Sequence, residues 1–140
     1  MRGRSLLTPT DAGDFAHLIF ACLFHDIGYV RGILEGDGPD GYVIDAKGGK
    51  TKLPRGASDA ALKPYHVDRS KLFVMDRLSN HVLIDAARIA RAIEFTRFPP
   101  VETDNQDKED GMLLRAADAA NCGLARKARP QAIRSALCRE

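Results

Sequence analysis

The chain has 140 residues, of which 44% are hydrophobic and 29% are charged, and its formal net charge is +2. This length corresponds to a single folded domain, and the composition is that of a globular protein. Aromatic residues make up only 6% of the chain and tryptophan is absent, which argues against a surface that stacks nucleic-acid bases. The small net charge also argues against a general polyanion-binding surface. We therefore expect no specific nucleic-acid binding.

Cysteine usage and the lengths of the apolar segments favour a cytoplasmic protein that does not bind membranes. The three cysteines are odd in number and lack CxxC spacing, which favours reduced thiols: Cys22, Cys122 and Cys138. The longest apolar stretch, residues 15–24, has about half of the roughly 20 residues that a membrane-spanning helix needs. The first residues carry no sustained apolar stretch and are not expected to form a secretory signal.

The first predicted helix runs from about Thr8 to about Ile27. The segment 8–11, Thr-Pro-Thr-Asp, has the residue types of a helix start, and Gly28 is expected to end the helix. Apolar residues recur every three or four positions and predict one face toward the core: Phe15, Leu18, Ile19, Cys22 and Leu23.

Residues 31–57 predict an irregular insert that follows this helix. The segment is rich in Gly, Asp, Lys and Pro, with β-type residues at 42–44 and 51–53 on either side of a Lys-Gly-Gly-Lys sequence at 47–50. This pattern favours a short hairpin. A loop of this length in a small domain is often functional, so we expect a lid or a wall of a substrate site.

The remainder of the chain predicts further helices. One extends from a cap at Ser58 and Asp59 to residue 78, with Pro64 near its start. The next helix is expected at 82–95 and must end before the prolines at 99 and 100. A polar linker of residues 102–110 follows, and two further helices are expected at 113–120 and 130–137. The prediction is one all-α domain spanning 1–140, with a helical-bundle core at about 8–120 and a basic tail of undefined role at 121–140.

His25 and Asp26 lie at the end of the most apolar stretch and are followed by Ile27 and Gly28. An imidazole and a carboxylate at adjacent positions on a helix end can be directed at one cation. Asp118 lies among alanines at 116, 117, 119 and 120. A carboxylate on a closely packed face requires a cation or several hydrogen-bond donors. An exposed helix face next to Arg115 explains Asp118 equally well.

The other three histidines differ in what they can contribute. His17 precedes His25 by eight residues, about 12 Å along a helix, so the two cannot bind the same ion directly and His17 is expected in the core or at the surface. His81 is expected to face solvent or to cap a helix. His66 lies three residues before Arg69, which places a candidate ligand and a guanidinium on one helical face. An ordinary ion-paired surface is the alternative.

Arg69 and Arg97 lie close to predicted helix ends and are the candidate substrate contacts. The planar guanidinium binds phosphate oxygens through two parallel hydrogen bonds. For Arg97 the alternative is a pair with Glu94 at a spacing of three residues.

Together, four segments resemble the HD-domain superfamily of metal-dependent phosphohydrolases: HDIGYVRG at 25–32, YHVDRSKLF at 65–73, IEFTRFP at 93–99 and LLRAAD at 113–118. The resemblance implies an HD-type helical bundle in which His25, Asp26 and Asp118 hold a divalent cation such as Mn, Mg, Ni, Co or Fe. His66 would be a supplementary ligand or a phosphate contact. The implied reaction is hydrolysis of a phosphate ester or anhydride, for example of a nucleotide, with Asp26 orienting the attacking water.

Three features depart from the superfamily pattern. The sequence after Asp118 loses the acidic and aromatic character expected at the end of such a domain. The superfamily's first histidine normally lies on a separate upstream helix, whereas only 24 residues precede His25 and the histidine among them, His17, lies on the same predicted helix. Either the chain is an N-terminally shortened copy, or His66 or a water completes the metal shell, or the metal is bound weakly. Tyr29 stands where some members have Glu or Lys, so their acid–base scheme does not transfer.

Three functional hypotheses follow from these observations. The first is an HD-type phosphohydrolase whose partner is a phosphorylated small molecule or nucleotide. The second is a degenerate HD domain that binds metal or nucleotide without turnover, which the missing upstream histidine supports. The third is a helical scaffold or homo-oligomerisation domain in which His25 and Asp26 only terminate a helix and Asp118 is a surface acid.

Overall fold

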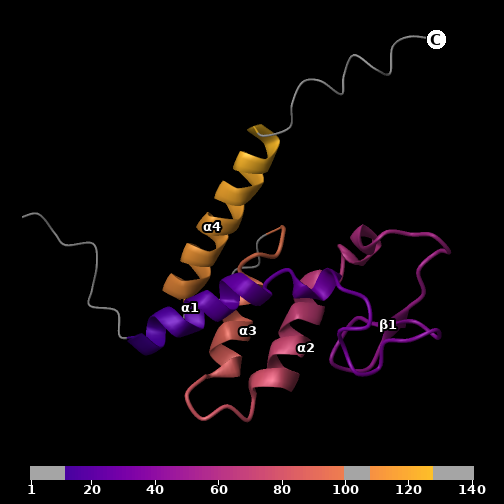
Figure 1. Cartoon of the computed structure of the whole chain (residues 1–140), viewed down its shortest axis with the longest axis horizontal. Coiled ribbons are helices and arrows are strands. Elements are labelled where there is room, and N and C mark those ends of the chain that lie inside the picture. The colour runs from indigo at the N-terminus through magenta and orange to yellow at the C-terminus, as the bar shows by residue number, and fades with distance from the viewer. Residues whose placement is uncertain (1–11, 100–107, 128–140) are drawn as a thin grey trace, which may run out of the picture.

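The computed structural model of the chain describes residues 12–99 and 108–127, which form four α-helices, two 3₁₀ helices and a two-stranded sheet (Figure 1). The elements in chain order are α1 (Ala12–Phe24), η1 (Ile27–Tyr29), β1 (Tyr42–Val43), β2 (Lys50–Thr51), η2 (Asp59–Leu62), α2 (His66–Leu78), α3 (Ala86–Glu94) and α4 (Lys108–Lys127). The predicted helical architecture with one irregular insert is confirmed. The predicted helix cap at 8–11, the helix at 130–137 and the tail from 128 onward lie outside the described residues.

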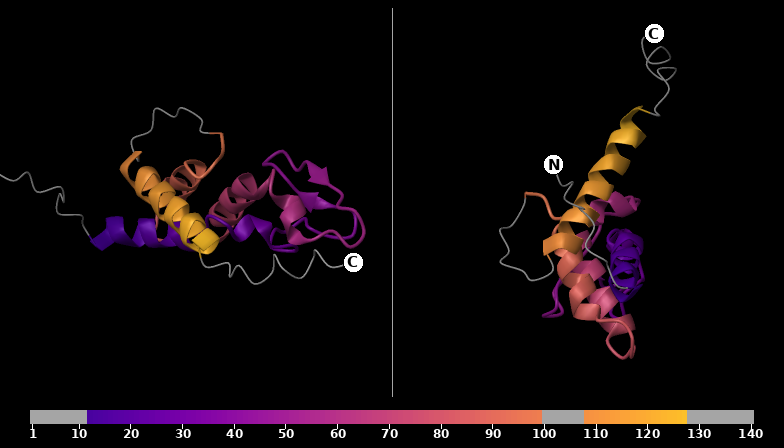
Figure 2. Two further views of the ribbon diagram at one scale, coloured as in Figure 1. Left: turned by 90° about the horizontal axis from the view of Figure 1, so that it is seen from above. Right: turned by 90° about the vertical axis from the view of Figure 1, so that its left-hand side faces the viewer.

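The core lies where α1, α2, α3 and the first half of α4 meet (Figures 1 and 2). Its buried apolar side chains come from all four helices: Ala21, Val67, Val74, Ala86, Ile89, Ala92, Ile93 and Leu114. Fully burying one large aliphatic side chain stabilises a fold by about 1.5–3 kcal/mol. Most of the large buried side chains of this core belong to α2 and α3, so these two helices contribute most of its stability. The second half of α4 projects away from the other helices (Figure 1).

The prediction of which face of α1 is buried is wrong for three residues. Phe15, Ile19 and Leu23 are 55%, 55% and 66% exposed, whereas Ala21 and His17 are buried. Leu18 and Cys22 are partly buried against the core, as expected. The helix is apolar on nearly every side, so its periodicity does not identify the side that packs on α3 and α4.

Gly28 acts differently from the predicted helix stop. α1 already ends at Phe24, and Gly28 is not among the glycines with positive φ. It is buried where η1 crosses α2, and a Cβ atom at this position would lie 2.0 Å from the backbone oxygen of His66. A glycine is therefore required by the close approach of two backbone segments.

The predicted helix over 58–78 is divided into two. η2 ends at Leu62 and α2 begins only at His66, while Ser58 makes no capping hydrogen bond through its side chain. Pro64 lies between them, and its lack of an N–H prevents it from continuing the hydrogen-bond ladder. His66 is consequently in the first turn of α2, whose end at Leu78 agrees with the prediction.

Helix α3 begins at Ala86, later than the predicted residue 82, and α4 begins at Lys108, earlier than the predicted residue 113. Asp85 caps α3 by accepting a hydrogen bond from the backbone of Arg88, and Val82 and Leu83, expected in this helix, are exposed. α4 begins at Lys108, so Asp110 belongs to the helix and not to the polar linker. Asp110 is buried and pairs with Arg88 at 2.7 Å, which joins the two helices.

The predicted hairpin within the insert is confirmed. β1 and β2 pair antiparallel, with Tyr42 opposite Thr51 and Val43 opposite Lys50. Asp45 accepts hydrogen bonds from the backbone N–H groups of Lys47 and Gly49, which closes the turn. These contacts shape the tip of the insert, and a separate contact holds its base to the helices.

Arg69 of α2 makes that contact. Its side chain is fully buried and pairs with Asp37, which is also fully buried, at 2.8 Å. The guanidinium donates five hydrogen bonds: to both carboxylate oxygens of Asp37 and to the backbone oxygens of Gly28, Val30 and Val43. Because an arginine has five N–H donors, every donor of Arg69 is used within the fold.

We expect Asp37→Asn to destabilise the fold by about 3–5 kcal/mol at neutral pH, because it leaves the buried Arg69 charge uncompensated. Burial raises the pKa of Asp37, but hydrogen bonds from Arg69 and from the backbone of Val43 outweigh this and leave the pKa below its ordinary value. A group whose pKa is lowered on folding stabilises above its unfolded pKa and loses that contribution as the pH falls through its folded pKa. The difference in the free energy of unfolding between wild type and Asp37→Asn, measured by urea denaturation, should therefore become smaller below about pH 4. Asp40→Asn, at an exposed position, is the control; a pH-independent difference would contradict this account.

Gly28→Ala should destabilise the fold by several kcal/mol, since backbone atoms of α2 have to move to admit the methyl group. Thermal unfolding followed by circular dichroism measures the effect. Gly13→Ala is the matched control, because a Cβ at this helical position meets nothing within 4 Å. Equal melting temperatures for the Gly28 variant and wild type would show that η1 and α2 are less closely packed than described here.

Candidate functional site

The four predicted metal ligands lie close to one another. His25 and Asp26 follow α1, His66 opens α2, and Asp118 lies in the middle of α4. His25 Nε2 is 3.3 Å from Asp26 Oδ2 and 3.7 Å from Asp118 Oδ1, and His66 Nε2 is 3.9 Å from Asp26 Oδ1. Residues more than ninety positions apart in the sequence thus form one group, which we call the His–Asp cluster.

Both imidazoles of the cluster are held in the same way. Nδ1 of His25 lies 2.8 Å from the backbone oxygen of Cys22, and Nδ1 of His66 lies 2.6 Å from that of Lys63. A carbonyl oxygen only accepts hydrogen bonds, so each Nδ1 carries a proton. In a neutral ring the lone pair is then on Nε2, the atom that faces the carboxylates of the cluster.

The electrostatics of His25 and Asp26 favour a positive species between them. The hydrogen bond to Asp26 raises the pKa of His25 above its ordinary value of 6.5, and burial only partly opposes this increase. The same hydrogen bond lowers the pKa of Asp26. With Nδ1 already protonated, Nε2 is the atom that takes up the second proton, and a metal ion bound there would have to displace that proton.

Backbone contacts fix the turn that carries Asp26. Ser70 of α2 is fully buried, donates a hydrogen bond to the backbone oxygen of His25 and accepts one from the backbone N–H of Gly28, at 2.8 and 2.9 Å. These bonds hold both sides of residue 26 against α2. Sequence reasoning missed Ser70, because a serine inside a helix carries no signal of a partner 45 residues earlier.

Tyr29 is a second neighbour that sequence reasoning did not assign to the site. Its ring stacks on His66 with the ring centroids 4.4 Å apart and an angle of 18° between the planes. Stacking of this kind restricts rotation of the imidazole. The signal in the sequence was the position of Tyr29 three residues after Asp26, on the same short turn.

The donor atoms of the cluster fit a divalent cation in type but are not yet gathered around one point. Two imidazole nitrogens and two carboxylates are a common ligand set for Zn and other transition metals. Two atoms bound to one ion at about 2.1 Å can be at most about 4.2 Å apart, and the three separations above satisfy this limit. Across residues 12–99 and 108–127, however, no group of three or more His, Cys, Asp or Glu side chains is already arranged to hold an ion.

Arg69, expected to contact phosphate, lies elsewhere in the fold. It is buried, and its five donors are bound to Asp37 and to backbone oxygens. The spacing from His66 placed both residues on neighbouring parts of α2, but Arg69 faces the insert. This prediction is corrected: Arg69 is a structural residue.

Arg97 pairs with Glu94, as the alternative interpretation proposed, and also with Asp68. Lys71 joins the same two carboxylates, at 3.1 Å from Asp68 and 2.6 Å from Glu94. Arg97 therefore belongs to a four-residue ionic network between α2 and the end of α3, not to the His–Asp cluster.

The two remaining histidines are outside the cluster, as predicted. His17 is buried, and its two ring nitrogens contact the backbone oxygen of Gly13 at 2.6 Å and the backbone N–H of Asp85 at 2.9 Å. His81 is exposed and accepts a hydrogen bond from the backbone of Leu83. Cys22 is a free thiol whose pKa is raised by burial; the side chains of Cys122 and Cys138 lie outside the described part of the chain.

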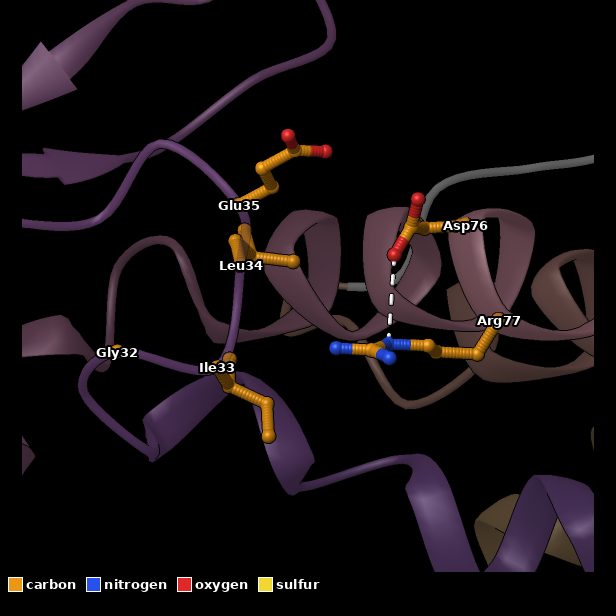
Figure 3. Close-up of a pocket in the computed structure, with 6 residues that line it drawn as sticks. All are labelled: Gly32, Ile33, Leu34, Glu35, Asp76 and Arg77. Carbon is orange, nitrogen blue, oxygen red and sulfur yellow. Dashed lines mark ion pairs between the residues drawn. The ribbon is translucent and has the colours of Figure 1, made fainter.

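A cavity of about 570 Å³ lies at the other end of α2 from His66. Figure 3 shows its lining, which comes from the start of the insert and the last turns of α2: Gly32, Ile33, Leu34, Glu35, Asp76 and Arg77. Asp76 and Arg77 pair with each other across 3.4 Å. The lining contains no residue of the His–Asp cluster, so this cavity is not the opening of that site.

Comparison with known proteins identifies a family for the chain. No curated protein and no solved structure matches the chain. None of the helices within 12–99 and 108–127 has the combination of length and apolar character that a membrane crossing requires. Residues 1–129 match the Npun_R2479-like family. This match covers nearly the whole sequence, and the chain belongs to the Npun_R2479-like family.

Proposed function

We propose that the chain is an HD-type, metal-dependent phosphohydrolase that acts on a phosphate ester or anhydride, with nucleotides as the first class to test. The observation that carries the proposal is the meeting of His25, Asp26, His66 and Asp118. The resemblance to the HD-domain superfamily predicts His25, Asp26 and Asp118 as ligands, and His66 as a supplementary ligand or a phosphate contact. The proposal includes a divalent cation at the cluster and a phosphorylated small molecule or nucleotide as substrate.

The residues of the cluster would coordinate the cation through different atoms. His25 and His66 would bind the cation through Nε2, because Nδ1 of each ring is taken by a backbone oxygen. Asp26 and Asp118 would supply carboxylate oxygens, which lie 3.3 and 3.7 Å from Nε2 of His25. A divalent cation bound here lowers the pKa of a bound water and neutralises charge that develops on phosphate oxygens.

Asp26 is the best candidate for orienting the attacking water. Its side chain is 57% exposed, more than those of His25, His66 and Asp118 at 16%, 18% and 33%. Oδ2 of Asp26 lies near His25 and Oδ1 lies near His66, while more than half of the side chain is open to solvent. A lowered pKa keeps Asp26 ionised and able to accept a hydrogen bond from water.

A degenerate HD domain that binds metal or nucleotide without turnover is the second candidate. The observation in its favour is that both ring nitrogens of His17 are bonded to backbone groups, so neither is available to a metal ion. His17 thus does not replace the upstream histidine of the superfamily. With two histidines and two aspartates the site has enough ligands for a cation, but it lacks one of the usual set.

The first test is metal binding by the purified chain, measured by calorimetry with Mn²⁺, Co²⁺ and Ni²⁺. His25→Ala and Asp118→Asn should each weaken binding at least tenfold, since the first removes a ligand nitrogen and the second replaces a charged carboxylate by a neutral amide. Binding should also weaken as the pH falls below neutrality, because the raised pKa of His25 lets protons compete for Nε2. Both effects follow from one assignment of the coordinating atoms.

His81→Ala is the matched control for this test, because His81 is exposed and its imidazole contacts only its own turn. Its metal affinity should equal that of wild type. Unchanged affinity in both the His25 and the Asp118 variants would rule out the cluster as a metal site and leave the helical scaffold as the remaining interpretation.

The second test is turnover of phosphomonoesters, phosphodiesters and nucleotides with added Mn²⁺, Mg²⁺, Ni²⁺ or Co²⁺. Asp26→Asn should lower kcat by about 10²–10⁴-fold if Asp26 orients the nucleophile. Asp76→Asn, at an exposed position at the other end of α2, should retain wild-type kcat. Tight metal binding without turnover of any substrate in the panel would favour the degenerate domain.

A further inference from the structure

Two basic residues, Lys63 and Arg115, directly precede members of the His–Asp cluster. Lys63 lies three residues before His66, and Arg115 lies three residues before Asp118. We propose, on the basis of the function proposed above, that Lys63 and Arg115 bind the phosphate group of the substrate and that the substrate is a phosphomonoester.

The arginines expected to contact phosphate are bound elsewhere in the fold. Arg69 is buried among its own acceptors. Arg97 belongs to the ionic network between α2 and α3, in which two cations already face two carboxylates. Arg31, which follows η1, pairs with Asp59 and bonds to a backbone oxygen. A phosphate group at the cluster therefore requires other cations.

Lys63 connects η2 to the first turn of α2. Its backbone oxygen lies 2.6 Å from Nδ1 of His66, so its main chain contacts a residue of the cluster. Its side chain is exposed and makes no hydrogen bond or ion pair with residues 12–99 or 108–127. The ammonium group on its flexible stem thus has its donors available for a ligand.

Arg115 lies next to Asp118 on the surface of α4. Residues three apart on a helix have Cβ atoms about 5–6 Å apart. Leu114 is 1% exposed and marks the side of α4 that faces the core. At 100° per residue, Asp118 and Arg115 are rotated from Leu114 in the same direction, by about 40° and 100°. Arg115 is exposed and has no ionic or hydrogen-bonding partner in the part of the chain that the structure describes.

The two cations are carried by segments on opposite sides of the cluster. Figures 1 and 2 show α4 on one side of the junction between α1 and α2 and η2, which Lys63 follows, on the other. An oxyanion at the cluster would lie between these segments. The guanidinium of an arginine binds two phosphate oxygens at once, and the ammonium of a lysine adds a mobile point charge.

The charges of the site favour a phosphomonoester. The two carboxylates of the cluster match a divalent cation, and imidazoles bind metals as neutral rings. A phosphomonoester has a second pKa of about 6 and carries close to two negative charges at pH 7, whereas a phosphodiester carries one. Lys63 and Arg115 supply two positive charges. A monoester such as a nucleoside monophosphate is therefore the better match.

Phosphate binding is measured on the full-length chain loaded with Mn²⁺, by equilibrium dialysis with inorganic phosphate, and Mn²⁺ affinity is measured by calorimetry. Lys63→Gln and Arg115→Gln should each weaken phosphate binding by about tenfold or more, since a hydrogen bond between charged groups is lost. Neither substitution should change the Mn²⁺ affinity. Arg77→Gln is the control, because it removes one positive charge at the far end of α2, where the side chain is 63% exposed; its phosphate affinity should equal that of wild type.

Turnover tests the substrate class with two substrates that share a leaving group, 4-nitrophenyl phosphate and bis(4-nitrophenyl) phosphate. Wild type should hydrolyse the monoester with the higher kcat/KM, and both variants should raise KM for it by about tenfold. A higher kcat/KM for the diester would overturn the proposed substrate class. Phosphate binding that depends on both residues, without turnover, would support the site and favour the degenerate domain.

The binding measurements separate a failure of this proposal from a failure of the proposed function. Mn²⁺ binding together with unchanged phosphate affinity in both variants would overturn the phosphate site and leave the metal site intact. A parallel loss of Mn²⁺ affinity in Lys63→Gln would overturn the role of Lys63, because the substitution would then act through the backbone that holds His66. A chain that binds no Mn²⁺ would overturn the proposed function and the phosphate site with it.

Discussion

The buried pair of Arg69 and Asp37 is the interaction on which the arrangement of the chain depends. A guanidinium removed from water costs several kcal/mol unless its charge and all its donors are satisfied, and Arg69 meets that condition with five hydrogen bonds. Its acceptors come from η1, from the segment after it and from the first strand of the hairpin. One side chain of α2 thus fixes three segments that have little apolar surface of their own.

This anchoring determines what the insert can do. The backbone oxygens of Gly28, Val30 and Val43 all bind Arg69, so the base of the insert and its first strand are held to the same point on α2. A lid has to move relative to the rest of the domain. The bonds to a buried arginine hold the base of the insert in place and argue against a lid, while a wall of a substrate site stays a prediction. The same anchoring keeps η1 against α2, which places Asp26 opposite His66.

The sequence predicts the helices and the hairpin because both depend on local residue types, whereas the full set of residues in the His–Asp cluster is predicted from the resemblance to the HD-domain superfamily. Turn residues between β-type pairs identify the hairpin, and an imidazole next to a carboxylate at a helix end identifies His25 and Asp26. Features that depend on contacts between distant segments are not predictable in this way. An arginine at position 69 could bind phosphate or backbone oxygens, and its residue type does not distinguish the two. A glycine at position 28 could end a helix or allow two backbone segments to approach closely. Because α1 is apolar on nearly every side, its sequence does not show which side is buried. A single sequence predicts local structure and candidate ligands, but tertiary packing decides which groups each side chain contacts.

A purely structural role leaves the His–Asp cluster without a physical reason. Asp26 and Asp118 are partly exposed, and ion pairs in such positions contribute about 0–1 kcal/mol to stability. Holding them there nevertheless requires a buried serine that bonds to both sides of residue 26, a glycine at a backbone crossing and two imidazoles oriented through Nδ1. These contacts hold Asp26 near the Nε2 atoms of both imidazoles, and Asp118 Oδ1 lies 3.7 Å from Nε2 of His25. The divalent cation that we propose would use all four groups at once, which is why we place the proposed function of the chain there.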